Sequence, residues 1–256
     1  MIKSGLVSVT FRKKTPAEIV TLVKQAGLDG IEWGGDIHVP HGNLALAREI
    51  AWMTHDAGLS VAAYGSYYRV AVDNQPAFGA VTETASELGA PTIRVWAGNR
   101  ASVDADSSYR ALVIDESRRI ADQAAQAGKT VSFEFHGGTL TDTNESARWL
   151  IEQISHPAIR CYWQPPLGHS DTYCLAGLHS ILAWLSHVHV FQWDADHTRH
   201  PLIAGANRWL KYLGSIAPTA GDHYAMLEFV NDDCDKQFLA DASTLMDWIR
   251  DLNHQS

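Results

Sequence analysis

The chain has 256 residues, 46% of them hydrophobic, and its 20 Lys and Arg against 29 Asp and Glu give a formal charge of −9. This acidic balance without a basic run makes nucleic acid and acidic membranes poor partners, and there is neither an apolar window of about 18 residues nor a signal-peptide core. Its three cysteines, Cys161, Cys174 and Cys234, form no CxxC pair, which argues against structural zinc and indicates free thiols in a cytoplasmic location.

Short apolar runs rich in β-branched and aromatic residues alternate with helical segments that carry capping residues and end at glycines. The first helix is predicted to open at Thr15-Pro16-Ala17-Glu18, a capping box, and to end at Gly27. In chain order, the predicted strands are Leu6–Phe11, Gly30–Gly35, Val61–Ser66, Thr92–Ala97, Val131–His136, Ile159–Gln164, His187–Trp193 and Ala225–Val230. The helices that follow are predicted to begin near residues 15, 43, 74, 104, 144, 175, 207 and 236.

Eight strand-then-helix units spaced by roughly thirty residues predict an α/β fold of the (β/α)8 TIM-barrel type. No Pro/Ser-rich linker or low-complexity tract interrupts the chain, so residues 1–256 are expected to form a single domain. A doubly wound open sheet is the alternative fold. Its dinucleotide-binding version is disfavoured, because no GxGxxG follows the first predicted strand.

The fifth predicted strand carries a carboxylate in an otherwise apolar run. Residues alternate across a strand, so Ser132, Glu134 and His136 share one face. Burying the Glu134 carboxylate costs several kcal/mol unless it is paired, protonated or bound to a metal. Glu134 could therefore pair with an Arg inside the barrel or hold a metal ion, and the recurrence of polar residues on later strands favours the second interpretation.

Active sites of such barrels lie at the C-terminal ends of the strands. If Glu134, Gln164, His189 and Glu228 all point inward, they bring together two carboxylates, an imidazole and an amide oxygen. This set suits Mn²⁺, Mg²⁺ or Co²⁺ better than a thiolate-seeking ion, and Zn²⁺ is also compatible with it. We therefore expect a divalent metal cofactor, with manganese preferred.

The sequence resembles the xylose-isomerase-like TIM barrels over its whole length. This family comprises sugar isomerases, ketose 3-epimerases and relatives with the endonuclease-IV fold. The specific motifs are Phe133-Glu134-Phe135-His136, His187-Val188-His189 and Leu227-Glu228-Phe229. In the family, four residues at the ends of strands five to eight, usually Glu, Asp, His and Glu, bind one divalent metal. The resemblance implies Glu134, Gln164, His189 and Glu228 as ligands, with Glu134 and Glu228 exchanging protons with the substrate.

The sequence departs from the family at strand six, where Trp163-Gln164-Pro165-Pro166 replaces the usual Asp followed by Gly or His. Gln164 offers a carbonyl oxygen without charge, so it would hold a metal more weakly or through a water. His169 and Asp171, in the following loop, are alternative ligands. His187 lies deeper than His189 on the same face, and we interpret it as a hydrogen-bonded core histidine.

Further residues near the predicted strand ends are candidates for substrate binding. Three tryptophans either pack against the helices or form apolar walls for a sugar ring. Arg94 either neutralises Glu32 or Glu134, or contacts the substrate, and Arg199 could meet a hydroxyl or a phosphate. No glycine-rich phosphate cradle follows strands seven and eight, which favours an unphosphorylated carbohydrate. The predicted substrate-binding residues are His38, Trp33, Arg94, Trp96, His136, Trp163 and Arg199.

The leading functional hypothesis is a metal-dependent sugar isomerase or epimerase that acts through a cis-enediolate, with Glu134 and Glu228 as acid and base. One alternative is a lyase or dehydratase that acts on a keto-sugar with a leaving group β to the carbonyl. A third interpretation is a metal-free sugar-binding barrel that has lost catalysis, in which Gln164 would indicate the lost metal site. The expected partner is a small carbohydrate, and a homo-oligomer is compatible with the sequence.

Overall fold

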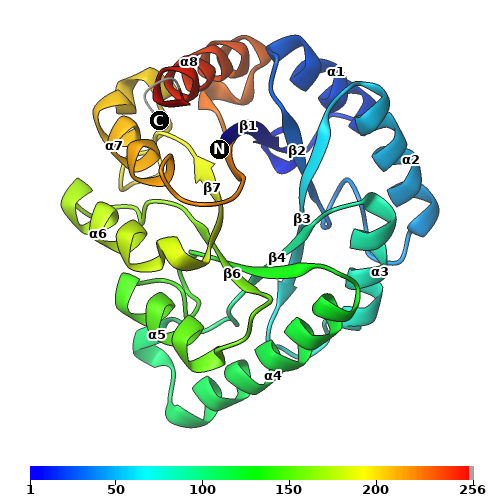
Figure 1. Ribbon diagram of the computed structural model, residues 1–256, viewed down its shortest axis with the longest axis vertical. Helices are drawn as coiled ribbons and strands as arrows, with labels where there is room; N and C mark the ends of the chain where they lie inside the picture. Colours follow the sequence, from blue (N-terminus) through cyan, green and yellow to red (C-terminus); the bar gives the residue numbers. More distant parts are fainter. Residues whose placement is uncertain (254–256) are drawn as a thin grey trace.

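The computed structural model describes residues 1–253 as a barrel of parallel strands surrounded by helices (Figure 1). The strands are β1 Ile2–Val7, β2 Gly30–Gly34, β3 Ser60–Arg69, β4 Thr92–Trp96, β5 Thr130–Glu134, β6 Ile159–Trp163, β7 Leu185–Val190 and β8 His223–Leu227. The α-helices are α1 Pro16–Ala26, α2 Leu44–Asp56, α3 Phe78–Leu88, α4 Ser107–Gln126, α5 Asn144–Ile154, α6 Asp171–Ile181, α7 Ala206–Ile216 and α8 Asp235–Asn253. Short 3-10 helices are η1 Ser8–Phe11, η2 Ser102–Asp104, η3 Leu182–Trp184, η4 Leu202–Gly205 and η5 Asn231–Asp233.

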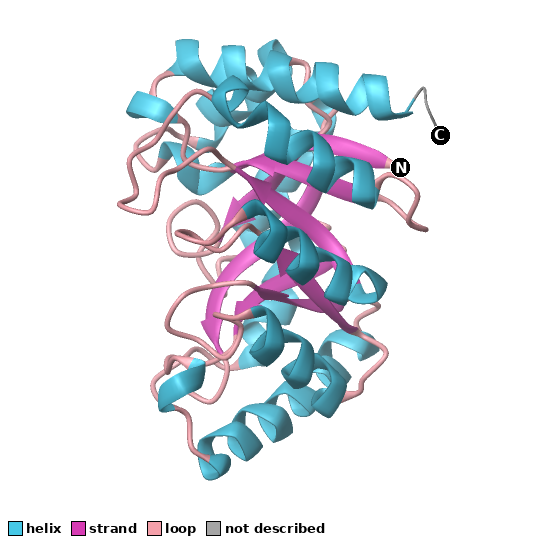
Figure 2. Ribbon diagram, turned by 90° about the vertical axis from the view of Figure 1, so that its left-hand side faces the viewer, coloured by secondary structure: helices cyan, strands magenta, loops and turns pink. Residues whose placement is uncertain are grey.

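The sheet closes because β1 pairs with both its sequence neighbour β2 and the last strand β8. All eight ladders are parallel and follow the order of the chain, which confirms the (β/α)8 prediction and excludes the open sheet. The longer loops lie mostly on the side opposite the N-terminus, where the strands end (Figure 2). Polar residues at the strand ends are thus gathered on one face of the barrel.

Local sequence signals set several boundaries as predicted. The side chain of Thr15 accepts a hydrogen bond from the Glu18 amide, while Glu18 reaches back to the Thr15 amide, and α1 ends at Gly27 with φ of 74°. The prediction that α3 begins near residue 74 was wrong. Asn74 adopts a left-handed turn with φ of 59° ahead of Pro76, and the helix starts only at Phe78.

Other boundary differences concern the strands that carry the site. The predicted strand Leu6–Phe11 was shifted: β1 ends at Val7, and η1 turns Val9 and Phe11 into the core. Strands β5, β7 and β8 each end earlier than predicted. As a result Glu134 is the last residue of β5, and Glu228 directly follows β8.

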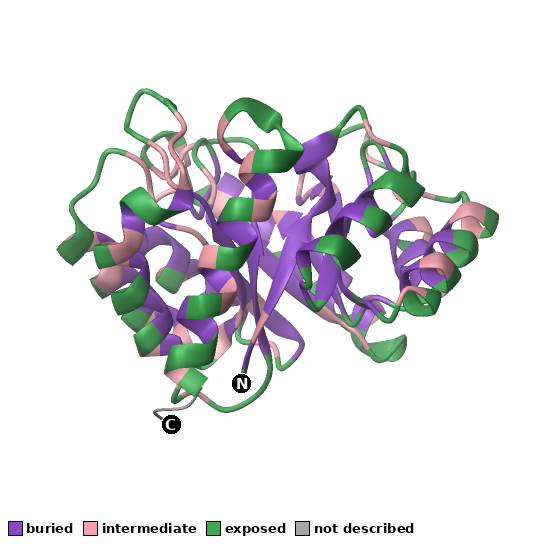
Figure 3. Ribbon diagram, turned by 90° about the horizontal axis from the view of Figure 1, so that it is seen from above, coloured by how far each residue is buried: buried purple, intermediate pink, exposed green. Residues whose placement is uncertain are grey.

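Apolar packing fills both layers of the barrel. Inside it, Val7, Ala63, Tyr162, Tyr224 and Met226 form a buried cluster, and a larger apolar layer lies between strands and helices. Figure 3 shows this as buried strands surrounded by helices whose outer faces are exposed. The polar residues at the strand ends therefore lie next to this apolar cluster inside the barrel. Among the described residues, no helix has the length and apolar character that crossing a membrane requires.

Candidate active site

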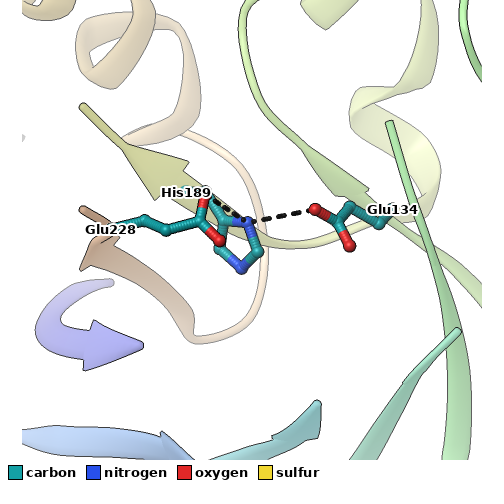
Figure 4. A group of neighbouring side chains, drawn as sticks. All are labelled: Glu134, His189 and Glu228. Atoms are coloured by element: carbon teal, nitrogen blue, oxygen red, sulfur yellow. Dashed lines mark ion pairs between the residues drawn. The ribbon is translucent and has the colours of Figure 1, made fainter. Parts of the chain in front are cut away.

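Three side chains from adjacent parts of the barrel converge at the strand ends. Glu134 ends β5, His189 belongs to β7, and Glu228 follows β8, where its amide donates to the Val190 carbonyl at 3.0 Å. One potential ligand atom from each of the three lies within 4.8 Å of the others (Figure 4). All three side chains are buried, so they meet in a region of low dielectric constant.

The three side chains are oriented around one nitrogen of His189. Its Nδ1 lies 3.4 Å from Oε2 of Glu228 and 3.6 Å from Oε1 of Glu134. Gln164, directly after β6, places its Oε1 3.2 Å from the same nitrogen. Its Nε2 donates to the Phe135 carbonyl at 2.6 Å, which fixes the amide orientation. Three oxygens from three strands thus face one imidazole nitrogen, an arrangement that matches a nitrogen–oxygen site for a hard or borderline divalent ion.

A second buried carboxylate and one arginine complete the charges of the site. Nε of Arg94 donates to Oε1 of Glu32 at 2.7 Å, and its Nη1 donates to Oε2 of Glu134. Arg94 therefore pairs with both Glu32 and Glu134, the two partners between which the sequence left the choice open. When Glu32, Glu134 and Glu228 are all ionised and His189 is neutral, the buried group carries three negative charges against the single positive charge of Arg94, a net charge of −2.

The surroundings separate the pKa values of the ionisable groups. Burial opposes ionisation of Glu32, but the Arg94 charge and His189 outweigh it and lower the Glu32 pKa to about 2. Burial opposes ionisation of Glu134 as well, and Arg94 with His189 holds its pKa well below the usual range. Burial, with the Glu134 charge, raises the pKa of Glu228 to about 7. Burial opposes protonation of His189, but Glu228 and the other carboxylates raise its pKa to about 10.

A cavity of about 690 Å³ opens above these residues. Aromatic side chains form two of its sides: Tyr67 and Trp96 lie with ring centroids 5.1 Å apart, and Trp193 lies 4.4 Å from Phe191 and 5.8 Å from Phe229. Tyr67 and Phe229 have φ of 59° and 49°, a strained conformation for bulky residues that tends to occur at functional sites. The volume suits a small molecule held between apolar walls above a polar floor.

Some of the predicted substrate-binding residues line this cavity. Arg94, Trp96 and His136 all face it. The indole N–H of Trp96 donates to Oε2 of Glu134, and the Trp96 and His136 rings lie with centroids 4.6 Å apart. His169 also lines it, but stacks on Tyr173 and is not part of the Glu–His–Glu cluster, while Asp171 pairs with Arg208 at 3.1 Å.

Four predicted substrate-binding residues do not line the cavity: Trp33, His38, Trp163 and Arg199. Trp33 is buried on the outer face of β2 and donates to Thr54 of α2 at 3.2 Å. Trp163 packs against Tyr212 of α7 with centroids 5.0 Å apart, and His38 is buried 2.9 Å from the Ser8 hydroxyl. The two tryptophans face the helices because side chains alternate along a strand. Trp33 and Trp163 therefore point away from the side on which their neighbours Glu32 and Gln164 lie.

Arg199 and His187 support the site from outside the cavity. The guanidinium of Arg199 lies 5.6 Å from the Trp193 ring centre and 5.1 Å from that of Phe229, and it pairs with Asp233. Arg199 thus stabilises an aromatic wall rather than lining the cavity. His187 accepts from the Tyr224 amide at 3.1 Å and contacts the Ala62 carbonyl at 3.3 Å, which confirms the core-histidine interpretation.

The aromatic walls of the cavity were not predicted from the sequence. Tyr67, Phe191, Trp193 and Phe229 were not singled out, although Phe229 directly follows Glu228 and Trp193 closes the seventh apolar run. The available signal was their position just beyond a polar strand end. Their convergence, however, depends on left-handed backbone conformations that the sequence does not predict.

A family model described as xylose isomerase-like TIM barrel matches residues 20–252. The chain belongs to this family. Among curated proteins, a relative is the 3-dehydroshikimate dehydratase of Bacillus anthracis, which is 24% identical over 268 positions that cover 89% of this chain and 91% of the relative.

Solved structures of the xylose isomerase-like fold superpose closely on the chain. The probable 3-DHS dehydratase AsbF from Bacillus anthracis has a TM-score of 0.80 at 21% identity, covering 96% of this chain and 99% of that one. A Mycobacterium smegmatis xylose isomerase-like protein in complex with magnesium has a TM-score of 0.76 at 14% identity, covering 98% and 97%. The 3-keto-D-glucoside 4-epimerase of E. coli has a TM-score of 0.71 at 17% identity, covering 98% and 100%. These likenesses establish the shared fold.

Proposed function

We propose that this protein is a divalent-metal-dependent enzyme that removes a proton next to the carbonyl of a small hydroxylated substrate. The observation that carries the proposal is the convergence of three oxygens, from Glu134, Gln164 and Glu228, on Nδ1 of His189. Once His189 and Glu228 have lost their protons, the buried group has a charge of −2, which a divalent cation would balance, and unbalanced buried charge is strongly unfavourable. The magnesium complex of a structural neighbour is consistent with this assignment.

Glu134, Gln164, His189 and Glu228 are the proposed ligands. When bound, the ion supplies Lewis acidity that polarises the substrate carbonyl and acidifies the neighbouring C–H. The chain's own groups shape the rest of the site. Arg94 and Trp96 hold Glu134 in place, and the aromatic walls limit access of water to the substrate.

The two glutamates are not equivalent, which revises the symmetric roles suggested by the family resemblance. Oε2 of Glu134 accepts from Arg94 and Trp96, and its Oε1 accepts from Gln164 at 3.3 Å. Within residues 1–253, the Glu228 carboxylate has only His189 as an ion-pair partner. A bound ion would lower the basicity of both carboxylates, but Glu134 is in addition paired with Arg94, which makes it the weaker base of the two. We therefore assign proton removal to Glu228 and a holding role to Glu134.

His136 is the proposed second acid–base group. Its Nδ1 lies 2.7 Å from the Gly137 carbonyl, so an N–H there donates to that oxygen and leaves Nε2 available toward the cavity. Protonated His136 could deliver a proton to a departing hydroxyl. Glu228 would take the proton from carbon, a C=C bond would form, the C–O bond would break, and water would leave.

Dehydration of a β-hydroxy carbonyl compound is accordingly the reaction we favour, since it needs one base and one acid. The similarity to a 3-dehydroshikimate dehydratase agrees with it. Isomerisation or epimerisation of a sugar is the second candidate, supported by the paired glutamates and by the epimerase among the structural neighbours. Both reactions start with the same proton removal.

One experiment distinguishes these reactions. Purified protein with Mn²⁺ is incubated in D₂O with ketoses, aldoses, 3-keto-sugars and 3-dehydroshikimate, and products are followed by NMR. A dehydratase gives an unsaturated product that has lost water. An isomerase or epimerase gives a product of unchanged formula that has gained deuterium at carbon. If no substrate in the panel exchanges a proton or reacts, the proposed function is wrong.

A further inference from the structure

Glu32 is a fully buried carboxylate that contacts the candidate metal site from the side away from the cavity. Its Oε2 lies 3.5 Å from Nε2 of His189, and its Oε1 accepts from Nε of Arg94 at 2.7 Å. Glu32 does not line the cavity, so it has no direct contact with a substrate there. A buried charge in this position needs another explanation, because burying it is costly.

The contact with Nε2 determines which nitrogen of His189 is free. Carboxylates lie beside both nitrogens, Glu228 at 3.4 Å from Nδ1 and Glu32 at 3.5 Å from Nε2. A metal ion bound at Nδ1 would take the place of a proton there, so the single N–H of neutral His189 would lie on Nε2, where the Glu32 carboxylate accepts it. With the proton on Nε2, the lone pair is on Nδ1. That nitrogen is the one that faces the oxygens of Glu134, Gln164 and Glu228.

Gly65 provides the space in which this arrangement fits. It pairs with Gly34 of β2 on one side and with Arg94 of β4 on the other. A Cβ built on Gly65 would lie 2.5 Å from Oε1 of Glu32 and 2.7 Å from Nη2 of Arg94, both closer than real Cβ contacts. The Glu32–Arg94 pair therefore occupies the space that a side chain would take.

We propose that Glu32, held by Arg94 in the space left by Gly65, is a positioning residue that fixes the tautomer and orientation of His189 for metal binding. This inference rests on the proposed function, because it assumes that His189 is a ligand. Removing such a carboxylate partner typically weakens metal affinity by about 10–100-fold. Glu32 would act through geometry as well as through its charge.

Calorimetric titration of Mn²⁺ into metal-stripped proteins separates these contributions. Glu32→Gln removes the charge and keeps the shape. Gly65→Ala keeps every charge but displaces the Glu32–Arg94 pair. Asp241→Asn is the matched control, because Asp241 is a buried carboxylate on α8 whose partners are the Leu202 amide and Gln237, outside the site. We expect about 10–100-fold weaker binding in the first two variants and wild-type binding in the control.

A second measurement reports on the histidine itself. In protein labelled with ¹⁵N-histidine and loaded with diamagnetic Zn²⁺, the His189 Nε2–H should give a downfield proton signal in the wild type. This signal should shift upfield or exchange away in both Glu32→Gln and Gly65→Ala. Circular dichroism melting identifies any variant that fails to fold, and the remaining variant then decides the question.

The outcomes are distinct. If wild-type protein binds no Mn²⁺, Co²⁺, Mg²⁺ or Zn²⁺, the proposed function fails and this inference fails with it. If the wild type binds metal and both variants bind it equally well, the metal site stands and the role of Glu32 is wrong. Weaker binding in Glu32→Gln alone, with unchanged Gly65→Ala, would mean that Glu32 acts only through its charge and would overturn the positioning role.

Discussion

Nδ1 of His189 lies 3.4 Å from Oε2 of Glu228, and this buried contact links the protonation of the site to its metal affinity. In the metal-free protein the pKa of His189 is raised to about 10, because Glu228 and the other carboxylates outweigh burial. Burial and the Glu134 charge raise the pKa of Glu228 to about 7. Both groups must lose their protons before they can act as ligands.

Metal affinity should therefore rise with pH. Below about pH 7 both groups hold a proton, so binding releases roughly two protons, whereas between pH 7 and 10 it releases about one, from His189. Titration of Mn²⁺ at pH 6 and pH 8, in buffers of different ionisation enthalpy, counts the protons released. Equal affinity at both pH values, without proton release, would contradict the assignment of these ligands.

Metal binding should also stabilise the fold. An ion that binds only the folded state adds about 2.7 kcal/mol to the free energy of unfolding at one hundred times its dissociation constant. Protein stripped with EDTA should therefore melt at a higher temperature when Mn²⁺ is added back. The Glu134→Gln/Glu228→Gln double variant is the control, since its melting temperature should respond little to Mn²⁺.

The two glutamates should respond differently to substitution. Glu228→Gln removes the proposed base but keeps an oxygen donor, and loss of a general base typically costs about 10²–10⁴-fold in rate. Glu134→Gln removes the charge that balances Arg94, so its main expected effect is loss of metal. Metal content measured beside turnover separates these effects, and full turnover in metal-loaded Glu228→Gln would refute its role as base.

Gln164 provides a test at the position where the chain departs from its family. Gln164→Leu keeps the bulk but removes the donor, so Mn²⁺ affinity should fall while the fold persists. Gln164→Asp adds a negative charge and should tighten binding if its shorter side chain reaches the ion, with equal or lower turnover because the ion is more neutralised. Identical Mn²⁺ dissociation constants in all three proteins would remove Gln164 from the metal shell.

Two tryptophans form a matched pair for testing the cavity. Trp96→Phe removes the N–H that donates to Glu134 and alters a cavity wall, so KM and kcat for the identified substrate should both change. Trp33→Phe removes the hydrogen bond to Thr54 and leaves a small buried cavity, which should cost about 1–3 kcal/mol of stability and leave the kinetics unchanged. Equal kinetic effects of the two substitutions would contradict the placement of the cavity.

The sequence by itself determined the repeating strand–helix order of this chain. Capping residues, glycine stops and short β-branched runs act within a few residues, so α1 with its Thr15 and Glu18 capping box could be predicted locally. The polar positions Glu134, His189 and Glu228 stood out because a carboxylate or imidazole within an apolar strand is costly unless it has a partner. Alternation along β2 and β6 also contained the signal that Trp33 and Trp163 face the helices.

Only the tertiary structure decided how these positions meet. Pairing of β8 with β7 places Glu228 beside His189, and parallel pairing across strands far apart in sequence brings Arg94 between Glu32 and Glu134. The early ends of β5 and β8, together with the left-handed turns at Tyr67 and Phe229, set the shape of the cavity. These features depend on contacts between distant segments, which no local propensity encodes, and on backbone strain that only surrounding packing can hold.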